Sequence, residues 1–467
     1  VPATLHVDAP SPHIDWSAGS VELVTEARPW PVVDRPRRAA VSSFGISGTN
    51  AHVIVEQPAE PADVAPAPTE GLVRTEAVLW PLSARSTTAL AHQAQRLARH
   101  VREHPEHDPA AVAWSLATTR AALDQRAAVV GTDRDDLLAG LDALASGLPS
   151  SALVTGTAGV HGSGPVFVFP GQGGQSVRMA AGLVGRCGPF DARLGECQRA
   201  FAPYLDVDLV SVLTGEDDAW LGRVEILQPV LFAVGVCLAE VWRSAGVEPA
   251  VVIGHSQGEM AAACVAGVLS LDDAARAVIL RARALSALAG SGGMLAVDLP
   301  EAEVAARIEG VPGTVVAVLN GPGHVVVSGP PQTLADLRES WLVEGVRARP
   351  VPFDYASHNP AVEQVRERML TDLAGLSPRP GQVRMVSTVT GDWAEPQGMD
   401  GGYWYTNLRQ PVRFEQAVRT AVAAGHVTFV EVSAHPVLTL PVTAILDDTD
   451  TTGHTLSTLR RGDDDPT

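Results

Sequence analysis

The stretch VVIGHSQGEMAAACV, residues 251–265, constrains the fold more than any other part of the chain. A short apolar run typical of a buried parallel strand is followed by GHSQG and then by an alanine-rich run that favours a helix. In this G-x-S-x-G pattern Gly254 and Gly258 permit a sharp turn that exposes the Ser256 hydroxyl at the carboxyl edge of a sheet. The pattern therefore predicts a nucleophilic serine on an α/β fold, the alternative being a serine that only caps the helix.

The remaining pattern predicts several α/β parts. Residues 58–71 are rich in proline, alanine and glutamate and mark a boundary, and strand and helix signals then continue to about residue 160. From GPVFVFPGQGGQ, residues 164–175, apolar strands alternate with helices through residue 290, as in a parallel sheet. The order βαββαβ within residues 292–355 is the signature of a ferredoxin-like subdomain inserted into that sheet.

Charge and composition exclude several function classes. The formal net charge of −19 argues against a nucleic-acid partner. All 34 basic residues are arginine, which excludes Schiff-base chemistry and a phosphate loop of the GK[ST] kind. Positive charge aimed at a ligand must therefore come from arginine, which suits carboxylates and phosphates. The turn in FPGQGGQ is accordingly expected to offer the Gln172 N–H to an oxyanion rather than to cradle a phosphate.

The four cysteines and the hydropathy pattern bear on metal sites and on the compartment. None of the cysteines has metal-ligand spacing, so we expect buried thiols, no metal site and a reducing cytoplasm. We find no run of 18 or more apolar residues, and we expect no membrane span.

A nucleophilic serine needs a base, and His358 is one candidate. It lies in DYASHNPAVEQV, directly before Asn359 and Pro360, which are typical of an N-cap and a first helical residue. The imidazole is thus expected on a loop, where catalytic groups often lie. Other histidines that remain possible are His255, His324 and His435.

No acidic third member of a triad has a supporting motif. Asp354 and Asp392 are the acids that can be named. The second imidazole nitrogen can instead bond to a backbone carbonyl or an amide, so we expect a Ser–His dyad.

The segment SLDDAARAVILRARALSAL, residues 270–288, predicts a helix with one arginine near its buried face. At 100° per residue, Arg276 and Arg283 fall opposite the apolar stripe, whereas Arg281 falls only about 75° from its centre. A charge on that face requires a partner. Two readings stay open at this point: an internal ion pair, or a fork that clamps a substrate carboxylate.

The elbow is one of eight characteristic stretches, which follow one another along the chain in this order: FVFPGQGGQ, QPVLFAVGVCLAEVW, VIGHSQGEMAAA, VSGPPQTLADL, YASHNPAVE, YWYTNLRQPVRF, VEVSAHPVL and STLRRGDDDPT. Together they resemble the acyltransferase domain of modular type I polyketide synthases, over nearly the whole chain. The resemblance implies an α/β fold with an α/β-hydrolase-like core, an inserted ferredoxin-like subdomain and a small α/β linker domain.

The same resemblance implies roles for individual residues. It implies a catalytic dyad of Ser256 and His358, with the substrate carboxylate on Arg281. It further implies an oxyanion hole formed by the backbone N–H groups of Gln172 and Gln257. Asn407 matches the residue whose carbonyl orients the histidine.

The front of the chain resembles other parts of such synthases. VSSFGISGTNAHVIVE is similar to the C-terminal end of a ketosynthase, and His52 matches one of its catalytic histidines, but the first cysteine is Cys187, so the ketosynthase nucleophile is missing. The resemblance implies four parts. They are a ketosynthase remnant (residues 1–57), a ketosynthase-to-acyltransferase linker domain (58–160), an acyltransferase (161–440) with its insertion at 292–355, and a post-acyltransferase linker (441–467).

Three stretches resemble the methylmalonyl-selective pattern: RVEILQPV, the Gln257 of GHSQG, and YASH, which contributes Tyr355, Ala356 and Ser357. Malonyl-selective relatives tend to carry a bulky aromatic residue where Ser357 stands, and a small serine leaves room for a methyl branch. Because burying one methyl group is worth only about 0.8 kcal/mol, the discrimination is modest. Met260 and Asn359 depart from the commonest form of their motifs.

The resemblance implies a cytoplasmic enzyme that loads methylmalonyl from methylmalonyl-CoA onto Ser256 and passes it to the phosphopantetheine thiol of an acyl carrier protein. Implied partners are that carrier protein and the neighbouring ketosynthase domain, and no cofactor is expected. Alternatives are the same reaction with malonyl-CoA or ethylmalonyl-CoA, a serine thioesterase or other hydrolase, and a docking scaffold without catalysis.

Overall fold

The computed structural model describes residues 1–32, 34–58, 71–158 and 163–462, and the chain divides into two units, Val1–Thr69 and Glu70–Thr467. The first unit contains an antiparallel hairpin of β1 (Arg38–Phe44) and β2 (Asn50–Glu56). His52 stands opposite Ser42, and its Nδ1 lies 2.7 Å from the serine Oγ. Nearly every residue of this hairpin is exposed, including apolar ones such as Phe44 and Ile54.

The second unit begins with a small α/β layer. Its antiparallel sheet has the order β3-β4-β5, and α1 packs against α3. The N-cap residues of its three helices are Ser86, Asp108 and Asp133, whose side chains each accept a hydrogen bond from a backbone N–H of the first turn. The elements are β3 (Val78–Ala84), α1 (Thr87–Glu103), α2 (Pro109–Thr119), β4 (Gln125–Gly131), α3 (Arg134–Ser146) and β5 (Leu153–Thr157).

A five-stranded parallel sheet forms the centre of the main domain, in the order β12-β7-β6-β13-β14. Its middle strands are continuous apolar runs that are buried on both faces, as expected for parallel strands. The strands are β6 (Val166–Phe169), β7 (Val251–Gly254), β12 (Arg384–Val386), β13 (Thr428–Glu431) and β14 (His454–Ser457).

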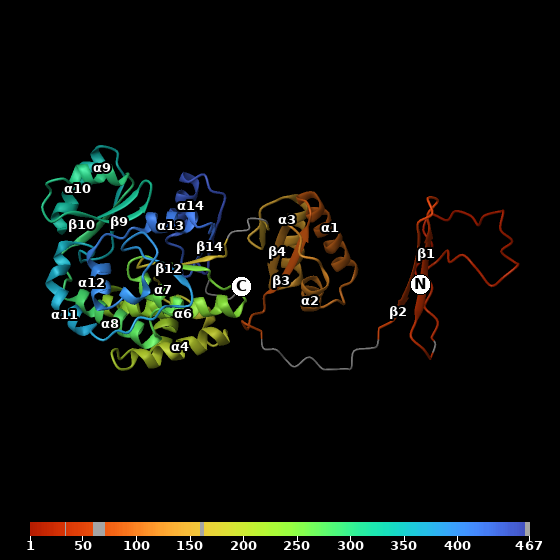
Figure 1. The fold of residues 1–467 in the computed structure, drawn as a ribbon, viewed down its shortest axis with the longest axis horizontal. Helices are drawn as coiled ribbons and strands as arrows, with labels where there is room; N and C mark the ends of the chain where they lie inside the picture. Colours follow the sequence, from red (N-terminus) through yellow and green to blue (C-terminus); the bar gives the residue numbers. More distant parts are fainter. Residues whose placement is uncertain (33, 59–70, 159–162, 463–467) are drawn as a thin grey trace. The chain divides into compact units, whose positions relative to one another are not determined.

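Helices cover both faces of this sheet (Figure 1). Alternate strand residues such as Phe167 and Val252 belong to a large core with α4 (Gly188–Phe201), α6 (Val224–Ser244), α7 (Gly258–Ala266) and α8 (Leu271–Ser286). Their neighbours in the strands pack on the other face with α13 (Phe414–Ala423) and α14 (Thr439–Asp448). This arrangement confirms the predicted α/β-hydrolase-like core.

The predicted ferredoxin-like insertion is also confirmed. Its four strands form an antiparallel sheet in the order β11-β8-β10-β9, with two helices between them in the sequence. The elements are β8 (Gly293–Val297), α9 (Glu301–Ile308), β9 (Val315–Gly321), β10 (His324–Gly329), α10 (Pro331–Val343) and β11 (Ala348–Val351). Strand β9 packs against α13 and α14, which joins the insertion to the core.

Shorter helices complete the main domain. They are η1 (Ala181–Leu183), α5 (Leu209–Thr214), η2 (Ala219–Gly222), η3 (Pro360–Val365), α11 (Arg366–Asp372), η4 (Pro396–Gly398) and α12 (Gly401–Arg409). The expected domain boundary at residue 440 falls inside α14, and β14 beyond it is the edge strand of the core sheet. The other expected boundaries stay predictions.

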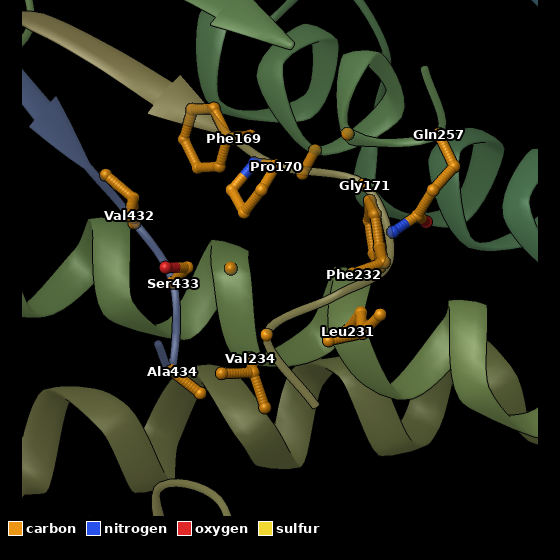
Figure 2. A pocket seen from close by; sticks show the side chains of 14 residues that line it. Phe169, Pro170, Gly171, Leu231, Phe232, Val234, Gln257, Val432, Ser433 and Ala434 are labelled. Atoms are coloured by element: carbon orange, nitrogen blue, oxygen red, sulfur yellow. The ribbon is translucent and has the colours of Figure 1, made fainter. Parts of the chain in front are cut away.

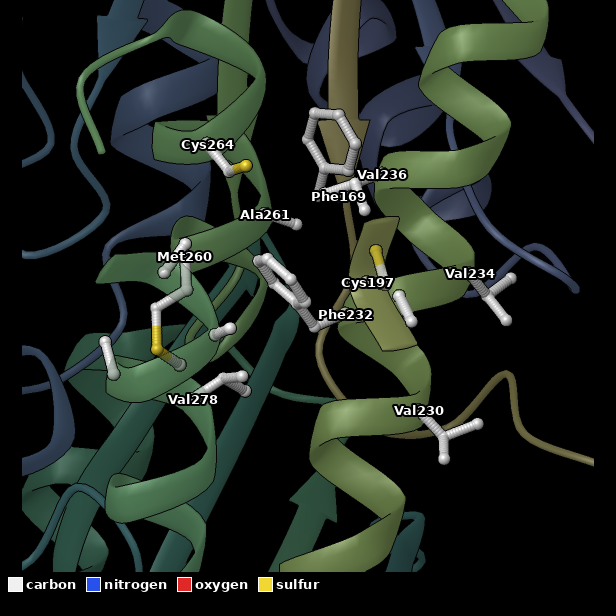
Figure 3. Close-up of a cluster of buried hydrophobic side chains, with 14 of the residues drawn as sticks. Phe169, Cys197, Val230, Phe232, Val234, Val236, Met260, Ala261, Cys264 and Val278 are labelled. Carbon is white, nitrogen blue, oxygen red and sulfur yellow. The ribbon is translucent and has the colours of Figure 1, made fainter. Parts of the chain in front are cut away.

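Helix α6 is the single helix of the described residues that is long and apolar enough to cross a membrane. Most of its apolar window, 78%, is buried inside the protein, which is typical of a core helix. Figure 3 shows Phe232 of α6 beside Met260 and Ala261 of α7. Its ring centroid lies 6.2 Å from that of Phe201 in α4, so this one side chain joins three helices.

We expect Phe232→Ala to lower the free energy of unfolding of the main domain by about 3–5 kcal/mol, because it leaves a cavity in a close-packed core. Urea unfolding followed by tryptophan fluorescence measures this change. The matched control is Leu440→Ala, at a side chain that is 81% exposed, with an expected change within about 0.5 kcal/mol. Equal effects of the two substitutions would contradict the packing described here.

Candidate active site

Ser256 lies in the turn between β7 and α7, with a left-handed backbone φ of +53°. The flanking glycines are required by space. A Cβ on Gly254 would lie 2.2 Å from the backbone of Glu259, and one on Gly258 would lie 2.2 Å from the carbonyl oxygen of Phe169. The turn is therefore pressed against the end of β6, and the predicted elbow is present with its serine at the carboxyl end of the sheet.

His358 contacts the serine. Its Nε2 lies 2.8 Å from Ser256 Oγ, and its Nδ1 lies 2.8 Å from the carbonyl oxygen of Gln410. Since a carbonyl can only accept, Nδ1 carries the proton and Nε2 is free to take one. Burial, assisted by the nearby charge of Arg281, lowers the pKa of His358 to about 3, so the imidazole is neutral at physiological pH.

The imidazole of His358 has two backbone partners. The carbonyl oxygen of Gln410 bonds to its Nδ1, and the backbone of Asn407, the residue predicted to orient the histidine, also contributes a hydrogen bond. Helix α12 ends at Arg409, and Gln410 follows in an extended conformation, so its carbonyl leaves the helix axis and is available to the imidazole. Asn407 lies within the last turn, and its side-chain Nδ2 donates to the carbonyl oxygen of Ser256 at 3.2 Å.

The other candidate histidines have different partners. His255 Nε2 lies 2.9 Å from Asn320 Oδ1, and burial lowers the pKa of this imidazole to about 4. His324 is exposed at the start of β10, and His435 Nδ1 accepts a hydrogen bond from the backbone N–H of Arg461. Within the described ranges, His358 is thus the one histidine in hydrogen-bond contact with Ser256.

The two acids that were considered as a third triad member do not reach the imidazole. The backbone carbonyl of Asp354 accepts from Gly290, and the carboxylate of Asp392 accepts from the N–H of Trp393. The arrangement around His358 is therefore a pair with Ser256, supported by a carbonyl.

Arg281 of α8 is 1% exposed and borders the same cavity. Its Nη1 donates to Gln228 Oε1 at 2.9 Å and its Nη2 approaches Asn407 Oδ1 at 3.5 Å, whereas its Nε has no partner in the described chain. Burial lowers the pKa of this guanidinium to about 10, which still leaves it charged at neutral pH. Both hydrogen-bond acceptors are neutral amides, so the internal ion pair considered from the sequence is not formed among the described residues.

A chain of amides connects the arginine to the turn after β6. Gln228 Nε2 donates to Gln172 Oε1 at 3.2 Å, and the hydroxyl of Tyr355 donates to the same oxygen. These two donors fix the side chain of Gln172 and thereby its turn. The backbone N–H groups of Gln172 and Gln257 donate to no atom of the described chain, which leaves both available beside the serine.

Behind the elbow, the carboxyl group of Glu259 is fully buried and hydrogen-bonded to two other segments of the chain. Its oxygens accept from Thr388, from Tyr403 Oη at 2.9 Å and from Asn407 Nδ2 at 2.8 Å. Burial raises the pKa of this carboxyl group above its ordinary value. Glu259 therefore joins the elbow helix α7 to α12, the helix whose end supports His358.

The cavity over Ser256 has a volume of about 220 Å³. Its floor is the elbow with Gln172 and Gln257, and its other wall is the sheet of the insertion, through apolar residues Met294, Ala296, Val318, Val326 and Val351. Ser357 lines it as well, with its Oγ 3.3 Å from Met294 Sδ. The site thus has a polar end with one cation and an apolar end.

Among the residues expected to set extender choice, Tyr355, Ser357 and Gln257 line the cavity, whereas Ala356 does not. A Cβ on Gly292 would lie 2.4 Å from the Cβ of Ala356, so Ala356 points to the start of β8 instead. Gln257 also borders a hollow of about 20 Å³, where Figure 2 shows its side chain beside Phe232. Its Oε1 is buried there without a partner.

Three residues of the site were missed by the sequence analysis: Gln228, Glu259 and Gln410. Gln228 stands in the quoted stretch RVEILQPV, but no local pattern indicated that its amide would reach Arg281, 53 positions away. Gln410 acts through its carbonyl, which every residue has, so only the fold can identify it.

Comparison with known proteins shows which families the chain matches. Residues 166–466 match the family described as "Acyl transferase domain", and residues 10–130 match "Ketoacyl-synthetase C-terminal extension". Polyketide synthase GfsA of Streptomyces halstedii is 53% identical over 99% of this chain, and erythronolide synthase EryA3 of Saccharopolyspora erythraea is 46% identical over 99%. The chain spans only 6% and 14% of these two relatives.

Solved structures agree with the sequence relatives. The acyltransferase domain from module 8 of the salinomycin polyketide synthase is 46% identical, with a TM-score of 0.82 over 85% of this chain and 94% of that one. The domain from the second module of the same synthase is 34% identical, with a TM-score of 0.67 over 83% of this chain and 90% of that one. The chain belongs to the acyl transferase domain family and is an acyltransferase of the modular polyketide synthase type.

Proposed function

We propose that the chain loads a methylmalonyl extender unit from methylmalonyl-CoA onto Ser256 and transfers it to the phosphopantetheine thiol of an acyl carrier protein. One observation carries this proposal: a buried guanidinium whose hydrogen-bond acceptors in the described chain are neutral amides, and whose Nε has no partner there, borders the cavity that holds the Ser256–His358 pair. A buried cation of this kind requires a counter-ion, and a dicarboxylic acyl group brings one.

In the first half-reaction His358 Nε2 takes the proton of Ser256 as the hydroxyl oxygen attacks the thioester carbonyl. The N–H groups of Gln172 and Gln257 stabilise the oxyanion of the tetrahedral intermediate. The intermediate collapses, the C–S bond breaks, and the imidazolium returns its proton to the leaving thiolate of CoA. The acyl group is then an ester of Ser256 with its free carboxylate on Arg281.

The second half-reaction reverses these roles. The carrier-protein thiol gives its proton to His358 and attacks the acyl-serine, and the imidazolium protonates Ser256 as the ester bond breaks. All acid–base and electrostatic groups of this mechanism come from the chain. The match of the front segment to a ketosynthase extension supports the neighbouring ketosynthase as a second partner.

The choice of methylmalonyl rests on the small side chain of Ser357 beside Met294 in the cavity wall. We propose that this corner receives the 2-methyl branch. A larger side chain at position 357 would fill it, whereas a smaller extender leaves it partly empty at a cost of only about 0.8 kcal/mol per methyl group.

A serine hydrolase acting on neutral esters is the competing proposal, because the elbow and His358 serve it equally well. It makes no use of a buried cation. Substitution of Arg281 therefore separates the two.

We expect Arg281→Ala to lower acylation of Ser256 by methylmalonyl-CoA by about 100-fold or more, because the substrate carboxylate loses its charged partner. Intact-mass measurement of the acyl-enzyme over time gives the rate. Arg276→Ala is the matched control on the same helix, since that side chain donates to the backbone carbonyls of Asp372 and Ala374 away from the cavity. Unchanged loading in Arg281→Ala, with hydrolysis of p-nitrophenyl butyrate retained, would favour the hydrolase.

We expect kcat/KM for acylation to be nearly flat from about pH 5 to pH 8 and to fall only at lower pH. The neutral imidazole is the active form, and it takes up a proton as the pH falls through the pKa of about 3. Stopped-flow acylation at constant ionic strength, with circular dichroism to check folding at each pH, measures the profile. A single inflection between pH 6 and pH 7 would show a solvated imidazole and contradict the burial of His358.

We expect Ser357→Phe to shift the preference from methylmalonyl-CoA toward malonyl-CoA by about 10- to 200-fold, because the aromatic ring occupies the space proposed for the methyl branch. An equimolar mixture of malonyl-, methylmalonyl- and ethylmalonyl-CoA, followed by intact-mass measurement, reads all three products together. Ser357→Ala, which keeps the space open, is expected to retain the methylmalonyl preference. A preference for malonyl-CoA in the unsubstituted chain would overturn the proposed selectivity alone.

A further inference from the structure

Three imidazoles and a carboxylate gather at the end of α1, in the stretch HVREHPEH. The ring centroids of His100, His104 and His107 lie 4.5–5.2 Å apart. Glu106 lies between two of them, with its Oε1 3.0 Å from His104 Nδ1 and 3.8 Å from His107 Nε2. One ligand atom from each of His104, Glu106 and His107 falls within 4.8 Å of the others.

The backbone that carries this cluster is held by a residue outside it. Arg134, the first residue of α3, donates from Nη1 to the carbonyl oxygen of Val101 at 3.1 Å and from Nη2 to that of Pro105 at 2.9 Å. The same Nη2 also donates to the carbonyl oxygen of His107. The loop after α1 is thus fixed to a second helix.

Two further backbone hydrogen bonds fold the loop into successive turns. The N–H of His104 donates to His100 at 3.0 Å, and that of His107 donates to His104 at 3.2 Å. These turns bring the three imidazoles close together. A site that is arranged before its ligand arrives loses less entropy on binding.

We propose that His104, Glu106 and His107 bind a Zn²⁺ ion, with His100 as the neighbouring fourth ligand. Neutral imidazole and carboxylate are ligands that Zn²⁺ prefers, and four of them make the tetrahedral shell of a structural site. The side chains of His104 and Glu106 are 43% and 63% exposed, which leaves them room to rotate toward a common ion. The ion would clamp the end of α1 to the loop that Arg134 holds.

The cysteine spacings predicted no metal site, and the four cysteines are buried as expected. They do not compete for an added ion in the folded protein. The cluster belongs to the small α/β layer and takes no part in the proposed acyl transfer. Its test is therefore independent of that function.

Isothermal titration of the full chain with ZnCl₂, after dialysis against a chelator and then chelator-free buffer, tests the site. We expect one equivalent of Zn²⁺ with a micromolar dissociation constant, weakened at least tenfold in the His104→Gln/His107→Gln double variant. The matched control is His92→Gln, an exposed histidine of the same helix, which is expected to keep the affinity. Circular dichroism verifies that the variants fold.

Thermal unfolding with and without Zn²⁺ supplies a second readout, because an ion that binds the folded state raises the midpoint. We expect this increase in the unsubstituted chain and its loss in the double variant. Absence of saturable binding, or equal affinity in the double variant, would overturn the proposal. Binding abolished by His358→Gln instead would place the ion in the catalytic cavity, and would also overturn it.

Discussion

The contact of the elbow with the end of β6 is the constraint on which the catalytic geometry depends. Without a Cβ at Gly254 and Gly258, the turn closes to within van der Waals contact of the neighbouring backbone, and Ser256 takes a left-handed conformation that lifts its hydroxyl above the sheet. The backbone N–H of His255 donates to the carbonyl of Phe169 at 2.8 Å and locks the turn in place. Every other group of the site is placed relative to this rigid point.

Electrostatics then decide the protonation states. A buried guanidinium and a buried imidazole share one cavity, and burial disfavours the charged form of each. Arginine has so high an intrinsic pKa that Arg281 remains a cation, and its charge keeps His358 neutral and ready to accept a proton. A carboxylate bound to Arg281 would neutralise that cation. In the proposed mechanism, the substrate carboxylate therefore supplies a direct anionic partner for Arg281.

Glu259 helps to hold the segment that supports His358 in place relative to the elbow that carries Ser256. The carboxyl group lies on the elbow helix and is bonded by side chains of α12, and the end of α12 supports His358 through the carbonyls of Leu408 and Gln410. Serine and histidine come from segments 102 positions apart, and this buried acid is one of the physical links between them. Removing it would leave several buried donors unpaired.

The sequence by itself determined the main elements and the candidate site residues. The period of apolar residues predicted the parallel core and the βαββαβ insertion, the elbow pattern predicted Ser256, and the motifs pointed to His358 and Arg281. Tertiary structure alone decided the partners: that Gln410 supplies the carbonyl bonded to Nδ1 of His358, that Ala356 faces Gly292, and that Arg281 meets amides instead of an acid. The reason is physical, since local patterns encode the backbone conformation and the buried face, whereas hydrogen bonds between distant segments depend on how those segments pack.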